Sequence, residues 1–182
     1  MAPSKKTEIK RMMRAQERPA IDLVFVLQDV EDPVNVGSAF RIADALKVSE
    51  IVLTGISAKP PHTLISKVGS AKYQRGKWRY VPKVEDALLE LKERGYELSA
   101  VEITPTAEAY DTVPYPAKTA LVVGHEDHGV TRRALEHVHR TVFIPMFGKG
   151  ASLNVHVALG VVSFHVLHHG RHHQEAAGPD AP

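Results

Sequence analysis

The chain has 182 residues and no cysteine. This absence excludes a disulfide scaffold, a cysteine-ligated metal site and a cysteine nucleophile. It also fits a cytoplasmic protein, which is the location we expect. Long apolar runs are missing too, since no stretch approaches the roughly 20 residues of a membrane-spanning helix, and no apolar segment follows the basic residues near the N-terminus. We therefore expect no signal peptide and no membrane contact.

Three common functional motifs are also missing from the sequence. No G-x-G-x-x-G follows the first apolar run and no Walker A loop occurs, which argues against dinucleotide and nucleoside-triphosphate binding. No G-x-S-x-G is present, which argues against an α/β hydrolase. A hydrolase or a nucleotide-binding protein is thus an alternative that these absences count against.

The chain has little net charge, because 23 Lys and Arg side chains are nearly balanced by 21 Asp and Glu, which leaves a net charge of +2. The charge is unevenly distributed, however. Residues 1–19 contain six basic and two acidic side chains. We interpret this segment as a basic N-terminal arm. It either binds phosphates or only helps to keep the protein soluble.

Apolar runs of strand length alternate with longer runs of helical periodicity. The predicted strands are residues 21–30, 50–55, 78–81, 96–103, 119–123 and 141–146, and the predicted helices are residues 35–46, 84–95, 131–138 and 152–168. This alternation predicts an α/β domain over residues 20–169, with a mostly parallel sheet and helices on both faces. Residues 170–182 contain histidines but no apolar periodicity, and we expect a disordered tail there.

Three polar, glycine-containing loops follow predicted strands, at residues 28–41, 124–129 and 144–155. Ligands of open parallel sheets bind beyond the carboxyl ends of the strands. The three loops could therefore converge on one site. The alternative is that loops are polar and contain glycine in any case.

The same three loops carry motifs in a recognisable order. They read "NVGSAFR" at residues 35–41, "GHEDHG" at residues 124–129 and "IPMFGKGASLNV" at residues 144–155. In this order the chain resembles the SPOUT superfamily of RNA methyltransferases, and within it the TrmH (SpoU) family of ribose 2′-O-methyltransferases. The resemblance extends over residues 22–167.

The resemblance implies a fold and a cofactor. In that family the C-terminal segment of the α/β domain forms a deep trefoil knot, and S-adenosylmethionine lies in the knot. The matching cofactor-binding positions here are Val123, Gly124, Ile144, Met146, Ser152 and Leu153. The resemblance also implies a homodimer whose RNA site is completed across the interface.

The implied catalytic residues are Arg41, Asn35, Glu126 and Asn154. A guanidinium holds its proton too firmly to act as a general base, so we interpret Arg41 as a clamp for an RNA phosphate. Asn35 could orient Arg41 or the ribose, or cap the helix that follows it. Glu126 could hold Arg41 or Asn35 by a charge-assisted hydrogen bond, or only stiffen its loop.

The roles of several further residues and the identity of the RNA substrate stay open from the sequence alone. Ser152 could bind the cofactor or cap the last helix. His156 stands where the family more often has a small residue such as serine, and we interpret it as a packed or interface residue. The late histidines are expected to bind no metal. For the substrate we favour tRNA; the alternatives are rRNA, or a non-catalytic RNA-binding protein with the same fold.

Overall fold

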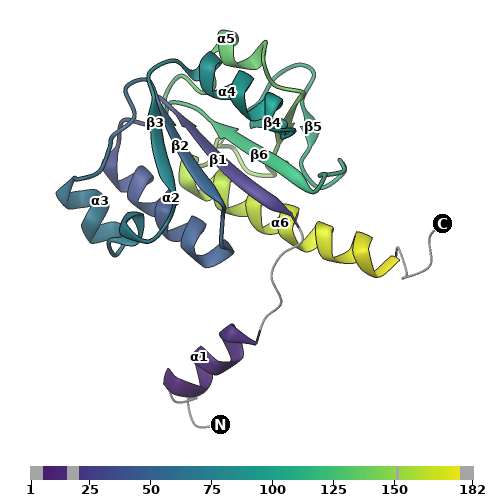
Figure 1. Ribbon diagram of the computed structural model, residues 1–182. Coiled ribbons are helices and arrows are strands. Elements are labelled where there is room, and N and C mark those ends of the chain that lie inside the picture. Colours follow the sequence, from purple (N-terminus) through teal and green to yellow (C-terminus); the bar gives the residue numbers. More distant parts are fainter. Residues whose placement is uncertain (1–5, 16–20, 151, 177–182) are drawn as a thin grey trace.

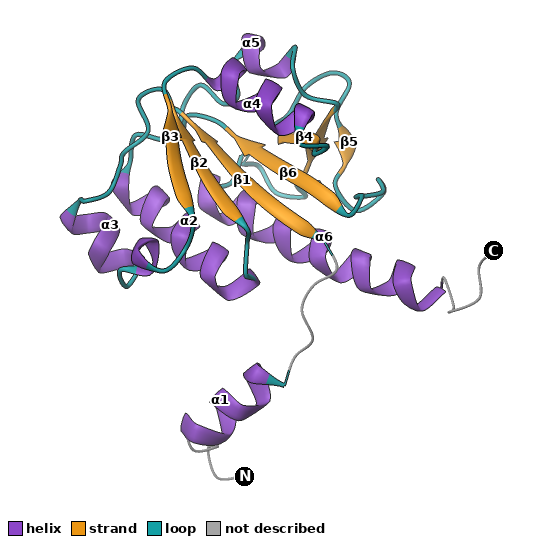
Figure 2. Ribbon diagram, viewed as in Figure 1, coloured by secondary structure: helices purple, strands orange, loops and turns teal. Residues whose placement is uncertain are grey.

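The computed structural model describes residues 6–15, 21–150 and 152–176. In this part of the chain a seven-stranded sheet lies between helices on both faces (Figures 1 and 2). Every pairing between named strands is parallel, and the strand order is β3-β2-β1-β6-β4-β7-β5. The strands are β1 (Asp22–Gln28), β2 (Glu50–Thr54), β3 (Trp78–Val81), β4 (Glu97–Val101), β5 (Glu108–Ala109), β6 (Lys118–Val123) and β7 (Arg140–Phe143). The predicted α/β class with a parallel sheet is confirmed.

Two helical layers cover the sheet. Helices α2, α3 and α6 lie on one face and α4 and α5 on the other (Figure 1). The helices are α1 (Lys6–Arg14), α2 (Pro33–Leu46), α3 (Thr63–Val68), α4 (Val84–Glu93), α5 (Arg132–Leu135) and α6 (Val155–Ala176), with a short 3₁₀ helix, η1 (Lys72–Gln74). None of the helices in the described part of the chain combines the length and apolar character that a membrane crossing requires.

Successive side chains of β1 point to opposite faces of the sheet and contribute to the two halves of the core. Leu23, Phe25 and Leu27 pack with the helices α2 and α6, whereas Val24 and Val26 pack with α4 and α5. Successive side chains of a strand point to opposite faces, so a strand covered on both faces is apolar at nearly every position. This explains why the sequence of β1 shows no polar alternation.

The start of α2 differs from the prediction. We expected the helix to begin near Asn35, with Asn35 as a possible cap. It begins at Pro33, and the cap is Asp32, whose carboxylate accepts a hydrogen bond from the N–H of Val34. Proline suits the first helical position because its missing N–H has no helical partner there. Asn35 is therefore inside the first turn, and its side chain is free for another role.

The C-terminal boundaries also differ from the prediction. Strand β7 ends at Phe143 rather than at residue 146. Helix α6 begins at Val155 rather than at residue 152 and continues to Ala176, past the predicted end at residue 168. The helix thus covers the first part of the predicted tail, and residues 177–182 lie outside the described residues. Three short elements were not predicted, namely α3, η1 and β5.

Candidate active site

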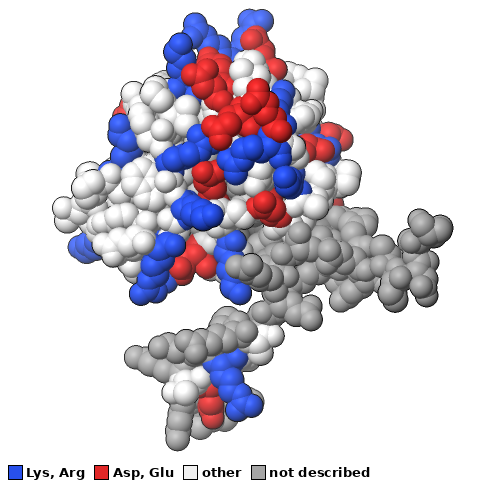
Figure 3. Space-filling model, viewed as in Figure 1, with Lys and Arg blue, Asp and Glu red and all other residues white. Residues whose placement is uncertain are grey.

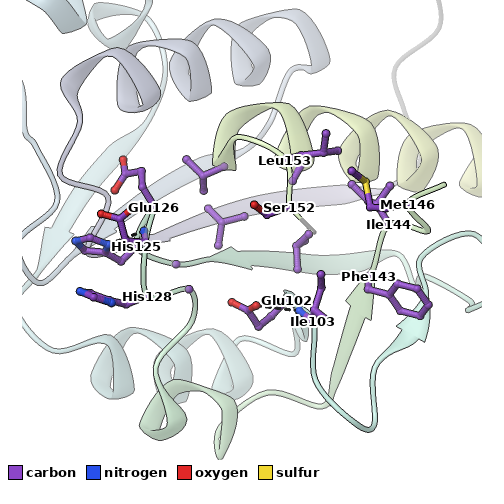
Figure 4. A pocket seen from close by; sticks show the side chains of 17 residues that line it. Glu102, Ile103, His125, Glu126, His128, Phe143, Ile144, Met146, Ser152 and Leu153 are labelled. Atoms are coloured by element: carbon purple, nitrogen blue, oxygen red, sulfur yellow. Dashed lines mark hydrogen bonds between the residues drawn. The ribbon is translucent and has the colours of Figure 1, made fainter. Parts of the chain in front are cut away.

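A cavity of about 310 Å³ opens at the carboxyl ends of β6, β4 and β7. Its walls are formed by residues 101–103 and 123–129 together with Phe143, Ile144, Met146, Ser152, Leu153, Val155 and Ala158 (Figure 4). All six predicted cofactor positions line it: Val123, Gly124, Ile144, Met146, Ser152 and Leu153. The structure thus brings together the segments that follow β4, β6 and β7, which are far apart in the sequence. Ligand pockets in proteins usually start at about 300 Å³, so the cavity is large enough to be a binding site.

The lining of the cavity suits S-adenosylmethionine chemically. Val101, Ile103 and Ile144 offer apolar walls to an aromatic base, and the carboxylates of Glu102 and Glu126 also line the cavity. A sulfonium and an ammonium group both carry positive charge, which carboxylates stabilise. The residues present therefore fit the cofactor that the resemblance implies.

Glu102 was not singled out from the sequence. Its carboxylate accepts hydrogen bonds from the N–H of Ile103, at 2.9 Å, and of Val130, at 2.7 Å. The second bond ties the end of the β4 segment to the loop that follows β6. Glu102 thus holds two walls of the cavity in place. The only sequence signal was a carboxylate at the end of a predicted strand.

The loop "GHEDHG" closes on itself through its backbone. His125 and Gly129 exchange two N–H to carbonyl bonds of 3.0 and 2.8 Å. Gly129 has a φ of +65°, a conformation that glycine adopts at little cost. A Cβ atom at Gly124 would overlap the backbone of Gly129. Both motif glycines therefore have a structural reason, which is to let the loop fold tightly at the edge of the cavity.

A hydrogen-bonded chain joins Glu126, Asn35 and His156. The Asn35 Nδ2 atom donates to Glu126 Oε1 at 2.8 Å. On its other side, Asn35 Oδ1 lies 2.8 Å from His156 Nδ1. The three residues come from the loop after β6 and the first turns of α2 and α6, so one network links all three motif segments. Asn35 is only 2% exposed, and Glu126 belongs to the cavity wall.

The chemistry of these groups determines the proton positions. An ionised carboxylate only accepts hydrogen bonds, so the Asn35 amide nitrogen must face Glu126 and its oxygen must face His156. An amide oxygen also only accepts, so His156 carries a proton on Nδ1. In the neutral imidazole the lone pair then lies on Nε2. The predicted packed histidine is therefore part of the polar network.

Glu126 is held in its ionised form. Burial would raise the pKa of its carboxyl, but hydrogen bonds from the Asn35 side chain and from backbone N–H groups lower it by more, so the net pKa lies below the ordinary value. Two of those N–H groups belong to Glu31 and Asp32, at 3.3 and 3.2 Å. Of the two predicted partners, Arg41 and Asn35, the structure thus pairs Glu126 with Asn35.

Asn154 caps the last helix. Its Oδ1 atom accepts a hydrogen bond from the N–H of His156 at 3.1 Å, and its carbonyl accepts from the N–H groups of Val157 and Ala158. The alternative that Ser152 is the cap is therefore wrong, because the helix begins three residues later than predicted. Ser152 instead lies on the cavity wall.

Arg41 stands apart from this network. Its side chain is exposed on α2. Within the described part of the chain it forms no hydrogen bond or ion pair, either to Asn35 or Glu126 or to a backbone carbonyl. The expected contact with Asn35 or Glu126 is thus not made. An exposed guanidinium without a partner is available to a ligand.

The structure describes the side chains of only some of the late histidines. His165 stacks edge-on against Tyr110 and Tyr115, with ring centroids 5.1 and 6.0 Å away. The side chains of His169, His172 and His173 are not among those the structure describes. Among the side chains that are, no group of three could hold a metal ion.

Comparison with known proteins places these observations in a family. The model of the SpoU rRNA Methylase family matches residues 22–164. The tRNA (guanosine(18)-2′-O)-methyltransferase of Thermus thermophilus is 32% identical over 158 residues, which are 85% of this chain and 79% of that protein. The 23S rRNA (guanosine-2′-O-)-methyltransferase RlmB of Neisseria meningitidis is 31% identical over 140 residues, which are 77% of this chain and 56% of that protein.

A solved structure supports the same placement of the fold. The TrmH/SpoU tRNA modifying enzyme of Aquifex aeolicus superposes with a TM-score of 0.78 at 24% identity, covering 97% of this chain and 89% of that one. At this level of identity the match concerns the fold alone. The fold includes the parallel sheet whose edge carries the cavity.

Proposed function

The chain belongs to the SpoU rRNA Methylase family, and from that premise we propose that it transfers the methyl group of S-adenosylmethionine to the 2′-hydroxyl of a ribose in RNA. One observation carries the proposal. The side chains of Asn35 and Glu126, from the first and second motifs, are bonded to each other at 2.8 Å, beside a cavity that the second and third motifs line. The three motifs thus form one site.

The cofactor belongs in the cavity. Val123, Gly124, Ile144, Met146, Ser152 and Leu153 hold it through backbone and apolar contacts. When bound, S-adenosylmethionine supplies an electrophilic methyl group on a sulfonium. The protein then has to place the ribose oxygen in line with that methyl group, and such positioning provides a large share of catalysis.

Arg41 holds the RNA in this proposal. Its exposed guanidinium on α2 binds a phosphate through two parallel N–H bonds. It also stabilises negative charge that develops on the ribose oxygen. A guanidinium remains protonated at neutral pH, so the proton of the hydroxyl leaves to another acceptor, such as a phosphate oxygen.

The polar network positions these groups. Glu126, held in its ionised form, fixes the amide of Asn35, and Asn35 in turn fixes the ring of His156. Asn154 anchors the first turn of α6 at the same place. Since the network joins α2 to α6, it holds the segment that bears Arg41 against the segment that lines the cavity.

The favoured RNA is tRNA, with rRNA as the alternative. The tRNA methyltransferase of T. thermophilus is matched over 79% of its length, whereas the rRNA methyltransferase of N. meningitidis is matched over only 56%. The basic arm at residues 1–19 would add contacts to RNA phosphates. Part of it forms helix α1, and residues 1–5 and 16–20 lie outside the described residues.

A homodimer would cover an apolar stripe on α6. Val157, Val161 and Phe164 lie at helical spacing, and they are 41%, 36% and 49% exposed. Residues four and three positions apart share one face of a helix. Apolar surface of this kind is typical of a protein interface. A second copy of the chain is the proposed partner, and it could place its own Arg41 near the cavity.

Two further parts of the proposal concern topology and location. We propose that the chain from β7 to α6 passes through a loop and forms the trefoil knot of the family. In support, β7 lies between β4 and β5 at one side of the sheet, whereas α6 packs in the same core cluster as α2 and β1. A cytoplasmic location remains a prediction.

One experiment tests the proposed reaction. The protein is incubated with methyl-labelled S-adenosylmethionine and total RNA, the RNA is digested, and the labelled nucleosides are separated. We expect label on a ribose 2′-oxygen, and in the tRNA fraction. Label on a base would contradict the proposal, and label in rRNA alone would favour the alternative substrate.

A further inference from the structure

A second cavity, of about 390 Å³, lies at the same carboxyl edge of the sheet. Its lining includes the ends of β1 and β2 and the starts of α4 and α5. The cofactor cavity is lined by Val155 and Ala158 of α6, so it lies on the opposite face of the sheet. The loop from Asp29 to Asp32 runs between the two, because Asp29 lines the second cavity and the backbone of Asp32 is bonded to Glu126.

Two buried polar side chains form the floor of this cavity. Gln28 and Thr54 are the last residues of β1 and β2 and are register partners. Each lies two positions after a valine, Val26 or Val52, that packs against α4 and α5, so both side chains point to that face. Gln28 is 1% exposed and Thr54 0% exposed. An apolar residue such as valine is more usual at a fully buried strand position.

The hydroxyl of Thr54 has no partner. Its Oγ1 atom is buried and makes no hydrogen bond to any residue in the described part of the chain. A buried polar atom of this kind costs stability and calls for a reason. Because Thr54 lies in the wall of the cavity, a polar ligand group that reached its hydroxyl would satisfy it.

The rim of the cavity is basic and includes a helix N-terminus. Lys83, Arg132 and Arg133 line it and are exposed. Helix α4 starts here with Lys83 at the cap position, which provides no side-chain acceptor for the first N–H groups. Such a terminus attracts anions. The carboxylates of Asp29 and Glu85 also line the cavity, and Figure 3 shows basic and acidic atoms side by side over α4 and α5.

This mixture fits a nucleotide better than a bare anion. A phosphate can bind to the basic rim and to the N–H groups of α4. The ribose hydroxyls or base N–H groups can donate to a carboxylate, and a ligand acceptor can take the proton of Thr54. The floor is also rigid: Asp29, at a φ of +55°, accepts hydrogen bonds from Gln28 and from the N–H of Ile56.

We propose that this cavity binds a nucleotide of the RNA substrate on the far side of the Asp29–Asp32 loop from the nucleotide that is methylated. This proposal rests on the proposed function, since it assumes an RNA that crosses the edge of the sheet. The RNA would then be bound on both sides of the reacting ribose. The cavity would then contribute to RNA affinity and to the choice of RNA, but not to cofactor binding.

The test compares Lys83→Gln/Arg133→Gln with the control Lys92→Gln, which lies at the other end of α4. Binding of a fluorescent tRNA transcript is measured by anisotropy at several salt concentrations, and cofactor binding by calorimetry. The double variant should bind RNA at least about tenfold more weakly, with a salt slope reduced by about 2, since each phosphate contact contributes about 0.9. The control should match the wild type within about twofold. Cofactor affinity should be unchanged in both variants.

A second variant tests the floor without altering charge. Thr54→Val keeps the shape of the side chain and removes only a hydroxyl that has no partner, so the fold should be kept. We expect KM for RNA to rise about three- to tenfold, as for the loss of one hydrogen bond, with an unchanged KM for the cofactor. Guanosine 5′-monophosphate should not bind with an affinity near that of the RNA.

The outcomes separate the two proposals. If the wild-type protein transfers no methyl group to ribose, the proposed function fails. If it does transfer the group, but the double variant and Thr54→Val keep wild-type RNA affinity, salt slope and KM, the nucleotide site is refuted. A third outcome is that guanosine 5′-monophosphate binds tightly to the wild type but not to the double variant, while RNA binding is the same in both. That outcome would assign the cavity to a free nucleotide and overturn the RNA assignment.

Discussion

Asn35 and His156 are 121 positions apart in the sequence, yet Asn35 Oδ1 lies 2.8 Å from His156 Nδ1. The other end of the same amide donates to Glu126. An amide is suited to this position because it offers a donor on one side and an acceptor on the other. Neither a carboxylate nor an apolar side chain could satisfy both neighbours.

Asn35→Asp is therefore expected to be damaging. The new carboxylate would face Glu126 as a like charge and would remove its hydrogen-bond donor. We expect the free energy of unfolding to fall by about 1–3 kcal/mol at neutral pH and methyl transfer to fall with it. Chemical denaturation measures the first effect. The control is Asn154→Asp, which should keep its stability because Asp and Asn cap helices equally well; equal stability of Asn35→Asp and wild type would contradict the network.

Glu126 should make the stability of the protein depend on pH. Its pKa in the folded protein is lowered, below the ordinary value of about 4.3 for an unfolded chain. A lowered pKa contributes stability that is present above the unfolded pKa and is lost as pH falls through the folded pKa. The difference in unfolding free energy between wild type and Glu126→Gln should therefore be constant from pH 7 to about 5 and shrink below that. A difference that grows on acidification would show that the assignment is wrong.

Arg41→Ala should separate catalysis from folding. The side chain is exposed, so the free energy of unfolding should change by less than about 0.5 kcal/mol. Cofactor affinity should also be kept, because Arg41 is not part of the cavity wall. Methyl transfer should fall by at least about 100-fold, the usual effect of losing a group that stabilises a transition-state charge. Arg41→Lys, which keeps the charge but not the paired donors, should recover only part of the rate. Near wild-type transfer by Arg41→Ala would refute the proposed clamp.

Gly124 and Gly148 should respond differently to alanine. A Cβ at Gly124 would overlap the backbone of Gly129, whereas a Cβ at Gly148 has no atom within 4 Å in the described structure. Backbone cannot yield as a side chain does, so Gly124→Ala should destabilise the protein and weaken cofactor binding at the same time. Gly148→Ala should leave the melting temperature unchanged. Thermal unfolding followed by circular dichroism measures both, and a stable, fully binding Gly124→Ala variant would exclude the tight loop.

The apolar stripe on α6 provides the test of the dimer. Val161→Glu/Phe164→Glu places two carboxylates on it, and burying them against a partner would be costly. We expect a dimer for the wild type and a folded monomer for this variant in sedimentation experiments. Leu89→Glu is the matched control, since Leu89 is similarly exposed, at 45%, but lies on α4. A double variant that still sediments as a dimer would assign the interface elsewhere.

Much of the sheet could be predicted because its strands are apolar on both faces. Strand β1 is the clearest case, with the run from Leu23 to Leu27 buried throughout. The short elements were not predicted, because the two residues of β5 and the three of η1 are too few to show a periodicity. The start of α2 was missed for a different reason. The motif drew attention to Asn35, although Asp32 and Pro33 carried the ordinary helix-start signal.

The candidate site was only partly predictable. The resemblance supplied six of the positions that line the cofactor cavity, and spacing alone would not have connected Val123 with Ser152. The role of His156 depends on how α6 docks against α2, and that is a property of the packed molecule. The pair Gln28 and Thr54 depends on strand register. Neither residue belongs to one of the three motifs, and the only sequence signal for the second cavity was the polar loop at residues 28–41, which contains Gln28 and Asp29.

The long separations within the Glu126, Asn35 and His156 network have a consequence for biosynthesis. The two hydrogen bonds of Asn35 connect residues 91 and 121 positions apart, and contacts of such separation form late because a long loop must close first. A nascent chain that has emerged only as far as β6 lacks both Glu126 and α6. The ribosome therefore releases a polypeptide that becomes competent only after its last helix has docked, so premature termination anywhere before α6 should yield an inert product rather than a weakened enzyme.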